Sequence, residues 1–349
     1  MNRHPISFFS FGAFCSEPIV SSILKSLRKL EYETLYFGVL EKNSCDSYKQ
    51  ENNLFFSTFS RNAIIRRLIF YIFLVKNKDK FVFTKKVVCY FPGCSVLNLI
   101  SRNNVLIIPS FSVSPSIFYR KLINLLIQVE SFTFKKVILF SSGMQKQLLK
   151  KSNIMNLGVN LHTENHALTS QPNFLYIGTL FNRNILDSVI GFKNYHYQGG
   201  SGKYHIICKK DVIEFAKIKK YIQSNKLDNV IMLYDGQKVQ NKNFFRLCDV
   251  GISYIPITKY YDIQPATKTF EYLANGMFVI GTKTEENKRS ICKNFGFLIA
   301  DNSAAFTDAC HKYEAFTEQI KLDRNYIATK HSFLLWDNVV KDQFLKLIS

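Results

Sequence analysis

The sequence predicts an α/β protein with two Rossmann-like, doubly wound domains. Apolar runs of strand length alternate with longer segments of helical periodicity, an order that produces parallel sheets with crossover helices. The strand-length runs are rich in β-branched residues without strict alternation, as expected for strands that are buried on both faces. The pattern stops at a polar segment, 159–172, and then restarts, and a chain of 349 residues suits two domains of ordinary size.

The N-terminal half contains the elements of one such domain. The predicted strands are Ile6–Phe11, Thr34–Val39, Val87–Phe91, Val105–Ile108 and Val137–Ser141. The predicted helices are Glu17–Leu30, Ala63–Val75, Cys94–Ser101, Pro115–Val129 and Gly143–Lys151. We therefore place the first domain at residues 1–160.

The second half repeats this alternation. The predicted strands are Asn173–Ile177, Tyr204–Cys208, Val230–Leu233, Val250–Ile255, Phe278–Gly281 and Gly296–Ala300. The predicted helices are Asn184–Phe192, Val212–Ser224, Lys242–Leu247, Lys268–Asn275 and Ala304–Tyr313. These elements place the second domain at residues 161–330, and the polar segment 159–172 is the predicted linker between the domains. Residues 331–349 have apolar side chains at helical spacing and predict a terminal amphipathic helix that needs a surface to dock on.

Several chemistries lack the residues that they need. No G-x-G-x-x-G follows a predicted strand, and Gly199–Tyr204 lacks the spacing of a phosphate loop. The sequence contains no D-x-D, no H-E-x-x-H and no C-x-x-C among its eight cysteines. We therefore predict no metal site and no cofactor, and we expect the cysteines to be reduced and buried.

The chain is strongly basic, with a formal net charge of +20. The excess is concentrated in residues 61–151, which contain 16 Lys and Arg residues and only two acids, Asp79 and Glu130. Three interpretations of this window stay open: a surface that binds an anionic membrane, a surface that binds nucleic acid, and an ordinary solvated face. Because no nucleic-acid-binding motif accompanies the charge, nucleic acid is not the expected partner.

The sequence also bears on location. We find no secretory signal peptide, because Pro5, Ser7, Ser10 and Gly12 interrupt the apolar residues near the N-terminus. No run reaches the ~18 apolar residues that a membrane-spanning helix requires. We therefore expect a cytoplasmic protein, either free in the cytosol or peripheral at the inner face of the membrane.

One segment points to a ligand. Asp262–Thr282 reads as a loop, a short helix, a glycine stop and a buried strand. The N-terminus of such a helix presents free N–H groups and a favourable dipole to phosphate. Thr267 is a residue type that caps helices, and Lys268 adds a cation at the same end. Glu271 shares a helix face with Lys268, where it can accept hydrogen bonds from ribose hydroxyls. The alternative is an ordinary surface salt pair.

This segment closely resembles the donor-binding signature of GT-B glycosyltransferases, especially the family-4-like group of bacterial surface-polysaccharide enzymes. The matching residues are Pro265, Lys268, Glu271, the turn Tyr272–Gly276 and the strand Val279–Ile280. Asn173–Leu180 is similar to the strand and glycine turn that open the C-terminal domain of these enzymes, and Tyr234–Pro256 is similar to the segment before the donor loop. The resemblance is clear over residues 173–301 and generic over 1–160.

The resemblance implies that the two Rossmann-like domains face each other across a cleft and that the C-terminal helix crosses back to the N-terminal, acceptor-side domain. It implies a donor site made of Gly12, Gly178, Thr179, Arg183, Gln264, Pro265, Ala266, Thr267, Lys268 and Glu271. In this site Glu271 would bind the ribose, and the Gln264–Thr267 backbone, Lys268 and Arg183 would hold the diphosphate. Gly12 would lie in the N-terminal loop that faces donor and acceptor.

The sequence departs from the signature at one position. Many members of the group carry a second glutamate eight residues before the ribose-binding one, where this chain has Ile263. Asp262 is adjacent but out of register. The contact with the sugar therefore stays open, and no catalytic base is identified.

The sequence thus predicts a hexosyltransferase-type glycosyltransferase that moves a sugar from a nucleotide-diphosphate donor to a glycan or lipid-linked oligosaccharide. The resemblance implies surface-polysaccharide biosynthesis, such as that of O-antigen or capsule, retention of the anomeric configuration, and no need for a metal. Two alternatives share the fold, a nucleotide-sugar epimerase and a non-catalytic binding protein. A basic nucleic-acid-binding protein is a more remote alternative.

Overall fold

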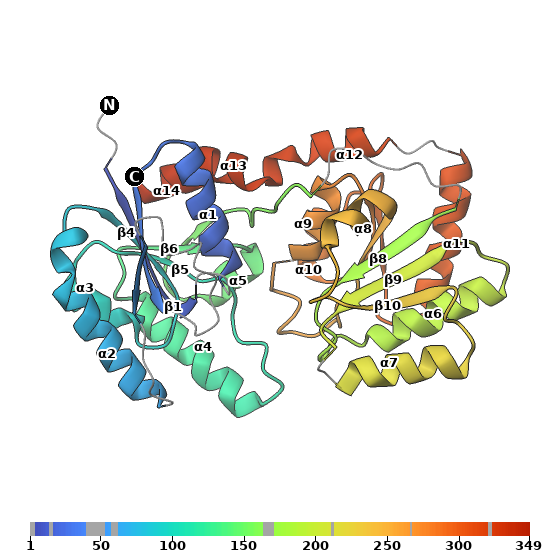
Figure 1. The fold of residues 1–349 in the computed structure, drawn as a ribbon, viewed down its shortest axis with the longest axis horizontal. Coiled ribbons are helices and arrows are strands. Elements are labelled where there is room, and N and C mark those ends of the chain that lie inside the picture. The colour runs from blue at the N-terminus through green and yellow to red at the C-terminus, as the bar shows by residue number, and fades with distance from the viewer. Residues whose placement is uncertain are drawn as a thin grey trace. The chain divides into compact units, whose positions relative to one another are not determined.

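The computed structural model describes residues 4–13, 17–39, 53–56, 62–162, 171–210, 213–265, 267–319 and 323–349. The chain divides into two compact units, each a parallel sheet flanked by helices (Figure 1). Unit 1 contains Met1–Gly158 and Trp336–Ser349, and unit 2 contains Val159–Leu335. The predicted class, α/β with two Rossmann-like domains, is confirmed. The boundaries that we expected at 160 and 330 fall at 158 and 335.

Unit 1 is built on a seven-stranded sheet in the order β3-β2-β1-β4-β5-β6-β7, with every pair parallel. The strands are β1 (Ile6–Ala13), β2 (Thr34–Val39), β3 (Asn53–Phe56), β4 (Lys85–Cys89), β5 (Val105–Ile107), β6 (Lys136–Leu139) and β7 (Asn153–Ile154). The two edge strands, β3 and β7, were not predicted. β7 is only two residues long, and both residues are exposed, so no buried apolar run marks it in the sequence.

Polar residues start three of the helices of unit 1. The side chains of Asn62, Ser116 and Ser141 each accept a hydrogen bond from a backbone N–H in the first turn of the helix that follows. The helices are α1 (Pro18–Lys29), α2 (Ala63–Lys76), η3 (Lys78–Lys80), η4 (Cys94–Val96), α3 (Leu97–Ile100), α4 (Ile117–Ser131) and α5 (Ser142–Gln147).

The C-terminal segment completes unit 1. It forms α13 (Trp336–Val339), a π-helical turn, η6 (Val340–Phe344), and α14 (Leu345–Ile348). Phe344 is fully buried and stacks on Phe8 of β1, with ring centroids 5.9 Å apart. Asp337 binds the Ser26 hydroxyl and the Lys29 ammonium of α1 at 2.5 and 2.8 Å. The predicted return of the C-terminal helix to the N-terminal domain is therefore confirmed. Residues 331–335, however, belong to unit 2.

Unit 2 has a six-stranded parallel sheet in the order β10-β9-β8-β11-β12-β13. Its strands are β8 (Asn173–Ile177), β9 (Lys203–Cys208), β10 (Ile231–Asp235), β11 (Val250–Ser253), β12 (Phe278–Thr282) and β13 (Gly296–Ile299). Its helices are α6 (Ile185–Tyr197), α7 (Ile213–Ser224), α8 (Asn241–Leu247), α9 (Thr267–Ala274), α10 (Glu285–Ser290), α11 (Ser303–Gln319), α12 (Arg324–Lys330) and η5 (Ser332–Leu334). The sequence did not predict α10 or α12, which are only 6 and 7 residues long.

The strand order of unit 2 determines where a ligand would bind. The order runs outward in one direction from β8 to β10 and in the other from β11 to β13, so it reverses between β8 and β11. In doubly wound sheets, ligands bind outside the carboxyl ends of the strands at this reversal. Here those ends are Ile177 of β8 and Ser253 of β11.

Candidate functional site

Helix α9 starts at the carboxyl edge of the second sheet. The chain leaves β11 at Ser253 and, after a loop, enters α9 at Thr267. Thr267 is therefore the first residue of the helix, and the predicted cap at this position is wrong, because a cap residue precedes the first helical residue. Lys268 and Glu271 lie in the first and second turns, next to the reversal point of the strand order.

The predicted glycine stop of α9 is confirmed. Gly276 has φ +74°, a left-handed conformation that favours glycine. The N–H groups of Gly276 and Met277 donate to the carbonyls of Leu273 and Tyr272, each at 3.0 Å. These two bonds form the Schellman ending of a helix. The chain then enters β12, which is buried along its whole length.

Two buried contacts hold α9 against the sheet. The Thr269 hydroxyl lies 2.8 Å from the Ser253 hydroxyl at the end of β11 and 2.7 Å from the amide oxygen of Asn287. The Tyr272 hydroxyl accepts a hydrogen bond of 3.0 Å from the N–H of Ile177 at the end of β8. Helix α9 is thus tied to both strands that flank the reversal point.

The pKa of the Glu271 carboxyl group is lowered by its surroundings. Its side chain is 16% exposed, and one carboxylate oxygen accepts a hydrogen bond of 2.5 Å from the Lys268 ammonium. Burial opposes ionisation, but the positive charge of Lys268 and the hydrogen bonds from His162 and Lys268 outweigh it and lower the pKa of Glu271 to about 2. The carboxylate therefore stays ionised at neutral pH.

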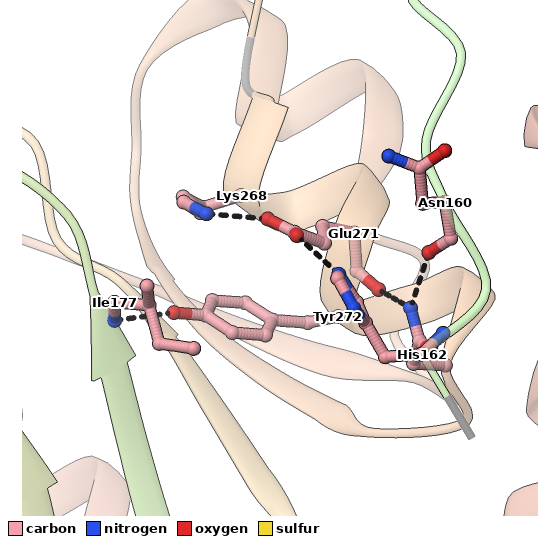
Figure 2. Close-up of polar contacts among 7 residues, drawn as sticks. Asn160, His162, Ile177, Lys268, Glu271 and Tyr272 are labelled. Carbon is pink, nitrogen blue, oxygen red and sulfur yellow. Dashed lines mark hydrogen bonds and ion pairs between the residues drawn. The ribbon is translucent and has the colours of Figure 1, made fainter. Parts of the chain in front are cut away.

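His162 holds the other oxygen of the same carboxylate. Figure 2 shows Glu271 between Lys268 and His162, whose Nε2 lies 2.7 Å from Oε1 of Glu271. The imidazole stacks on Phe245 of α8, with centroids 4.3 Å apart and an interplanar angle of 13°. The backbone N–H of His162 donates to the side-chain oxygen of Asn275 at 2.7 Å, and the Asn275 amide donates to the Asn160 carbonyl at 3.1 Å. The segment after Gly158 is therefore fastened along α9.

The sequence analysis did not identify His162 as a site residue. It lies in the segment that we assigned to the linker, 109 residues before Glu271. The polar stretch of residues 159–172 contains two histidines, His162 and His166, and one acid, Glu164. Nothing in this pattern indicates that His162 contacts Glu271.

A second cation lies at the end of β8. Arg183 packs on the ring of Tyr261, with its guanidinium carbon 4.3 Å from the ring centroid. Tyr261 is buried and belongs to the loop that precedes α9. In the turn itself, the Tyr176 hydroxyl donates to the Thr179 carbonyl at 2.6 Å, and the Gly178 N–H donates to the Ile207 carbonyl at 3.1 Å. The turn after β8 and the loop before α9 therefore meet at Arg183.

The remaining predicted residues are placed as follows. Gln264 and Pro265 lie in the last part of the loop before α9, where the Gln264 side chain donates to the Tyr260 carbonyl at 3.1 Å. Ala266 lies outside the described residues. Gly12 lies in β1 of unit 1, so its predicted place in a loop is wrong: β1 extends to Ala13. All the other predicted donor residues belong to unit 2.

Asp262, the acid beside the expected second glutamate, has another role. Its carboxylate accepts a hydrogen bond of 2.7 Å from the N–H of Glu285, the first residue of α10. It thus satisfies a free N–H at a helix start. This contact explains why Asp262 does not substitute for a glutamate at the position of Ile263.

These groups suit a particular kind of ligand. An ionised carboxylate accepts hydrogen bonds from vicinal hydroxyls, whereas Lys268, Arg183 and the start of α9 attract phosphate. Within the residues that the structure describes, no group of three or more His, Cys, Asp or Glu side chains is arranged to hold a metal ion. The positive charges that the described residues offer to a phosphate here include the side chains of Lys268 and Arg183.

A separate pocket of about 420 Å³ lies between α7 and the edge strand β10. Phe215, Ile222 and Ile231 are among its lining residues, and none of the predicted donor residues lines it. We therefore build the site on the residues around α9 and not on this pocket.

Comparisons with solved structures match the chain over nearly its whole length. A glycosyltransferase from Rickettsia africae ESF-5 has a TM-score of 0.75 at 13% identity, covering 99% of this chain and 98% of that one. Alr3699/HepE from Anabaena, in complex with UDP and glucose, has a TM-score of 0.76 at 11% identity, covering 99% of both chains. The lipopolysaccharide outer core galactosyltransferase WaaB, in its apo form, has a TM-score of 0.64 at 13% identity, with the same coverage.

No protein-family model matches the sequence, and no curated protein matches it either. The assignment of the fold therefore rests on the structural similarity, and at such low sequence identity this similarity supports the fold alone. With two Rossmann-like units and neighbours that are similar over the whole chain, the protein has the GT-B fold of glycosyltransferases.

Proposed function

We propose that this protein is a glycosyltransferase that moves a sugar from a nucleotide-diphosphate donor to a glycan or lipid-linked oligosaccharide acceptor. The observation that carries the proposal is the Lys268–Glu271–His162 contact at the reversal point of the second sheet. It combines a carboxylate that stays ionised with cations at the place where doubly wound folds bind nucleotides. HepE, a neighbour with the same fold, has been solved with UDP and glucose.

The proposed roles follow from the chemistry of each group. Glu271 accepts hydrogen bonds from the ribose hydroxyls. Lys268, Arg183 and the backbone around Gln264–Thr267 bind the diphosphate and stabilise the negative charge that develops on it as the sugar leaves. Because protein cations supply this neutralisation, we propose that the reaction needs no metal. Retention of the anomeric configuration is part of the same proposal.

The acceptor is the less constrained half of the proposal. WaaB, which has the same fold, is by its name a galactosyltransferase of the lipopolysaccharide outer core. We propose that this chain likewise builds a surface polysaccharide, working at the cytoplasmic face of the membrane. Unit 1, which contains the basic window of residues 61–151, is the proposed acceptor-side domain.

Thermal unfolding of the full chain with nucleoside diphosphates and nucleotide sugars tests the donor site. A ligand at about a hundred times its Kd stabilises the folded state by about 2.7 kcal/mol, which raises the midpoint of a unit of this size by about 5–10 °C. Glu271→Gln removes the charged acceptor and should weaken nucleotide binding by about 2 kcal/mol, which is a rise in Kd of about thirtyfold.

Glu314→Gln is the matched control for this variant. Glu314 also has a lowered pKa, and it accepts hydrogen bonds from Ser201. Ser201 precedes β9 and so lies at the amino ends of the strands, whereas the proposed site lies at their carboxyl ends. Its substitution should leave nucleotide affinity unchanged. Equal affinity of Glu271→Gln and the wild type would contradict the proposed site.

Product analysis separates transfer from the alternatives that share the fold. A glycosyltransferase releases free nucleoside diphosphate in proportion to glycosylated acceptor. An epimerase would convert the nucleotide sugar without acceptor, and a non-catalytic binding protein would bind it without turnover. Either of these results would replace transfer as the function while leaving the donor site intact.

A further inference from the structure

Helix α2 has a stripe of apolar side chains that are exposed on its outer side. Ile64, Leu68, Ile72 and Val75 follow at spacings of four, four and three residues, so they line one side of the helix. Their fractional exposures are 67, 57, 54 and 56%. The opposite side of α2 buries Phe70 and Leu74, so the exposed stripe is additional to the side that packs in the core.

Helix α4 shows the same feature. Phe118, Leu122, Leu125, Val129 and Phe132 follow at spacings of four, three, four and three residues along α4 and its C-terminal cap. All five are exposed, with Phe118 at 79%. A surface helix normally presents polar residues to water, so two outward stripes of this kind call for a partner.

Both helices pack on the same loop and lie on the same side of unit 1. The hydroxyl of Tyr71 in α2 donates to the Gly93 carbonyl at 2.6 Å, and the carboxylate of Glu130 in α4 accepts from the Gly93 N–H at 2.5 Å. Figure 1 shows α2, α3 and α4 on one side of the first sheet, with α1, α13 and α14 on the other. The two stripes therefore belong to one surface, which we call the α2–α4 face.

Lysines flank the two helices of this face, and residues 62–151 contain only two acids. Exposed lysines lie at the end of α2 (Lys76) and in η3 (Lys78 and Lys80). Lys121 lies in α4, and Lys150 lies against the end of α4, 3.4 Å from the Phe132 carbonyl. Of the two acids in residues 61–151, Glu130 is buried and only Asp79 is exposed. The face thus combines apolar side chains with a positive rim.

We infer that the α2–α4 face docks on the surface of an anionic phospholipid bilayer. Its apolar stripes would enter the boundary between headgroups and acyl chains, and its lysines would contact lipid phosphates, as in interfacial helices. Among the described residues, no helix is long and apolar enough to cross a bilayer, so the contact is peripheral. This inference concerns where the protein docks, and it is independent of the proposed sugar transfer.

Charge and polarity favour lipid over the other candidate partners. A second copy of the chain, joined by a two-fold axis, would bring two positively charged faces together, which is unfavourable. Nucleic acid would need polar contacts to phosphate and bases, whereas the outward positions of α2 and α4 are Ile, Leu, Val and Phe. An ordinary solvated face would be polar at those positions.

Vesicle sedimentation of the full chain, without donor or acceptor, tests the inference. The probes are vesicles of phosphatidylcholine alone and of an equimolar mixture with phosphatidylglycerol. We expect binding to the anionic vesicles to be at least about tenfold stronger, and to weaken when salt rises from about 0.1 to about 1 M and shortens the Debye length from about 10 to about 3 Å. Equal, salt-insensitive binding to both vesicles would overturn the inference.

Paired substitutions locate the contact. Leu68→Glu with Ile72→Glu changes α2, and Phe118→Glu with Leu122→Glu changes α4; each pair should weaken binding to anionic vesicles at least about tenfold. Because these side chains are exposed, circular dichroism should be unchanged. Ile213→Glu is the control, since Ile213 is 73% exposed but lies in α7 of unit 2.

Two results would overturn the assignment of this face. One is wild-type vesicle binding by both paired variants. The other is a dimer of the wild-type chain, seen by sedimentation velocity, that the paired substitutions dissociate, because the α2–α4 face would then bind a second copy. A negative result in the thermal-unfolding test with nucleotides would leave the vesicle result unaffected, so the two proposals fail separately.

Discussion

Glu271 is held from two sides by side chains of the protein itself. Lys268 and His162 each bind one oxygen of its carboxylate, and Phe245 supports the imidazole by stacking. A carboxylate that is already oriented loses less entropy when it binds hydroxyls. His162 therefore acts, in our interpretation, by positioning Glu271 and not by contacting the donor.

Substitutions of His162 test this positioning role. His162→Phe keeps the stacking on Phe245 but cannot donate a hydrogen bond to Glu271, and we expect nucleotide affinity to fall about tenfold, which corresponds to about 1.4 kcal/mol. His162→Gln restores a donor and should recover most of the loss. Titration calorimetry with the best nucleotide measures both variants. Wild-type affinity in His162→Phe would contradict the role.

Acid should reveal the lowered pKa of Glu271. The unfolded chain binds a proton at this group near pH 4.5, whereas the folded chain does so only near pH 2. The stabilisation is therefore complete above the unfolded pKa and is lost as the pH falls from about 4.5 to about 2. Between pH 6 and pH 3 it accounts for about 2 kcal/mol of the free energy of unfolding. Urea unfolding followed by circular dichroism should show that the free energy of unfolding of Glu271→Gln falls less steeply with acid than that of the wild type. An unchanged dependence would contradict the ion pair.

At the scale of elements, α9 connects the two strands at the reversal point. The Tyr272 hydroxyl is buried and accepts the N–H of Ile177, the last residue of β8. The same helix carries Lys268 and Glu271, so the register of α9 on the sheet determines where both charges lie relative to the turn that contains Gly178 and Arg183.

Tyr272→Phe should destabilise unit 2. The substitution leaves the buried N–H of Ile177 without its acceptor, at a cost of about 1–3 kcal/mol. Tyr254→Phe is a matched control, because the buried Tyr254 hydroxyl forms no hydrogen bond within the described part of the chain, so its loss should cost little. Urea unfolding compares the two variants. Equal stabilities would show that the Tyr272 contact contributes nothing.

Buried strands could be predicted from the sequence, whereas the edge strands could not. Thr34–Val39 and Asn173–Ile177 match the predicted strands because each is a buried apolar run. The edge strands β3 and β7 escaped prediction, because an edge strand is recognisable mainly by its pairing with a neighbour and carries little pattern of its own. Helix α9 was predicted to within one residue at either end, since a glycine in the left-handed region ends it.

At the scale of the whole molecule, the two units share one plan. In each unit the strand order runs outward from the first strand in both directions, which places a reversal point beside β1 in unit 1 and beside β8 in unit 2. The chain then returns to unit 1 through Trp336–Ser349. The glycine at 158 accommodates this return, because a Cβ at Gly158 would lie 2.2 Å from the Trp336 ring.

Phe344→Ala should destabilise unit 1. It removes a fully buried ring that stacks on Phe8, at an expected cost of about 3–5 kcal/mol. Trp336 is the only tryptophan of the sequence and belongs to unit 1, so its fluorescence follows the unfolding of that unit. Phe333→Ala is the control, because Phe333 is half exposed and lies in unit 2. An unchanged fluorescence transition in Phe344→Ala would contradict the docking of the C-terminal segment.

The amino-acid pattern alone is enough to identify the α/β class, most strands and helices, the glycine-terminated helix with Lys268 and Glu271, and the basic excess of residues 61–151. These properties are local, since apolar runs, cap residues and charges can be read without knowing what they contact. The folded chain was needed to show that His162 binds Glu271, that Arg183 packs on Tyr261, and that the exposed sides of α2 and α4 are apolar. Each of these depends on which surfaces meet when the sheets form, and an apolar residue in a helix has the same sequence pattern whether its side faces the core or the outside.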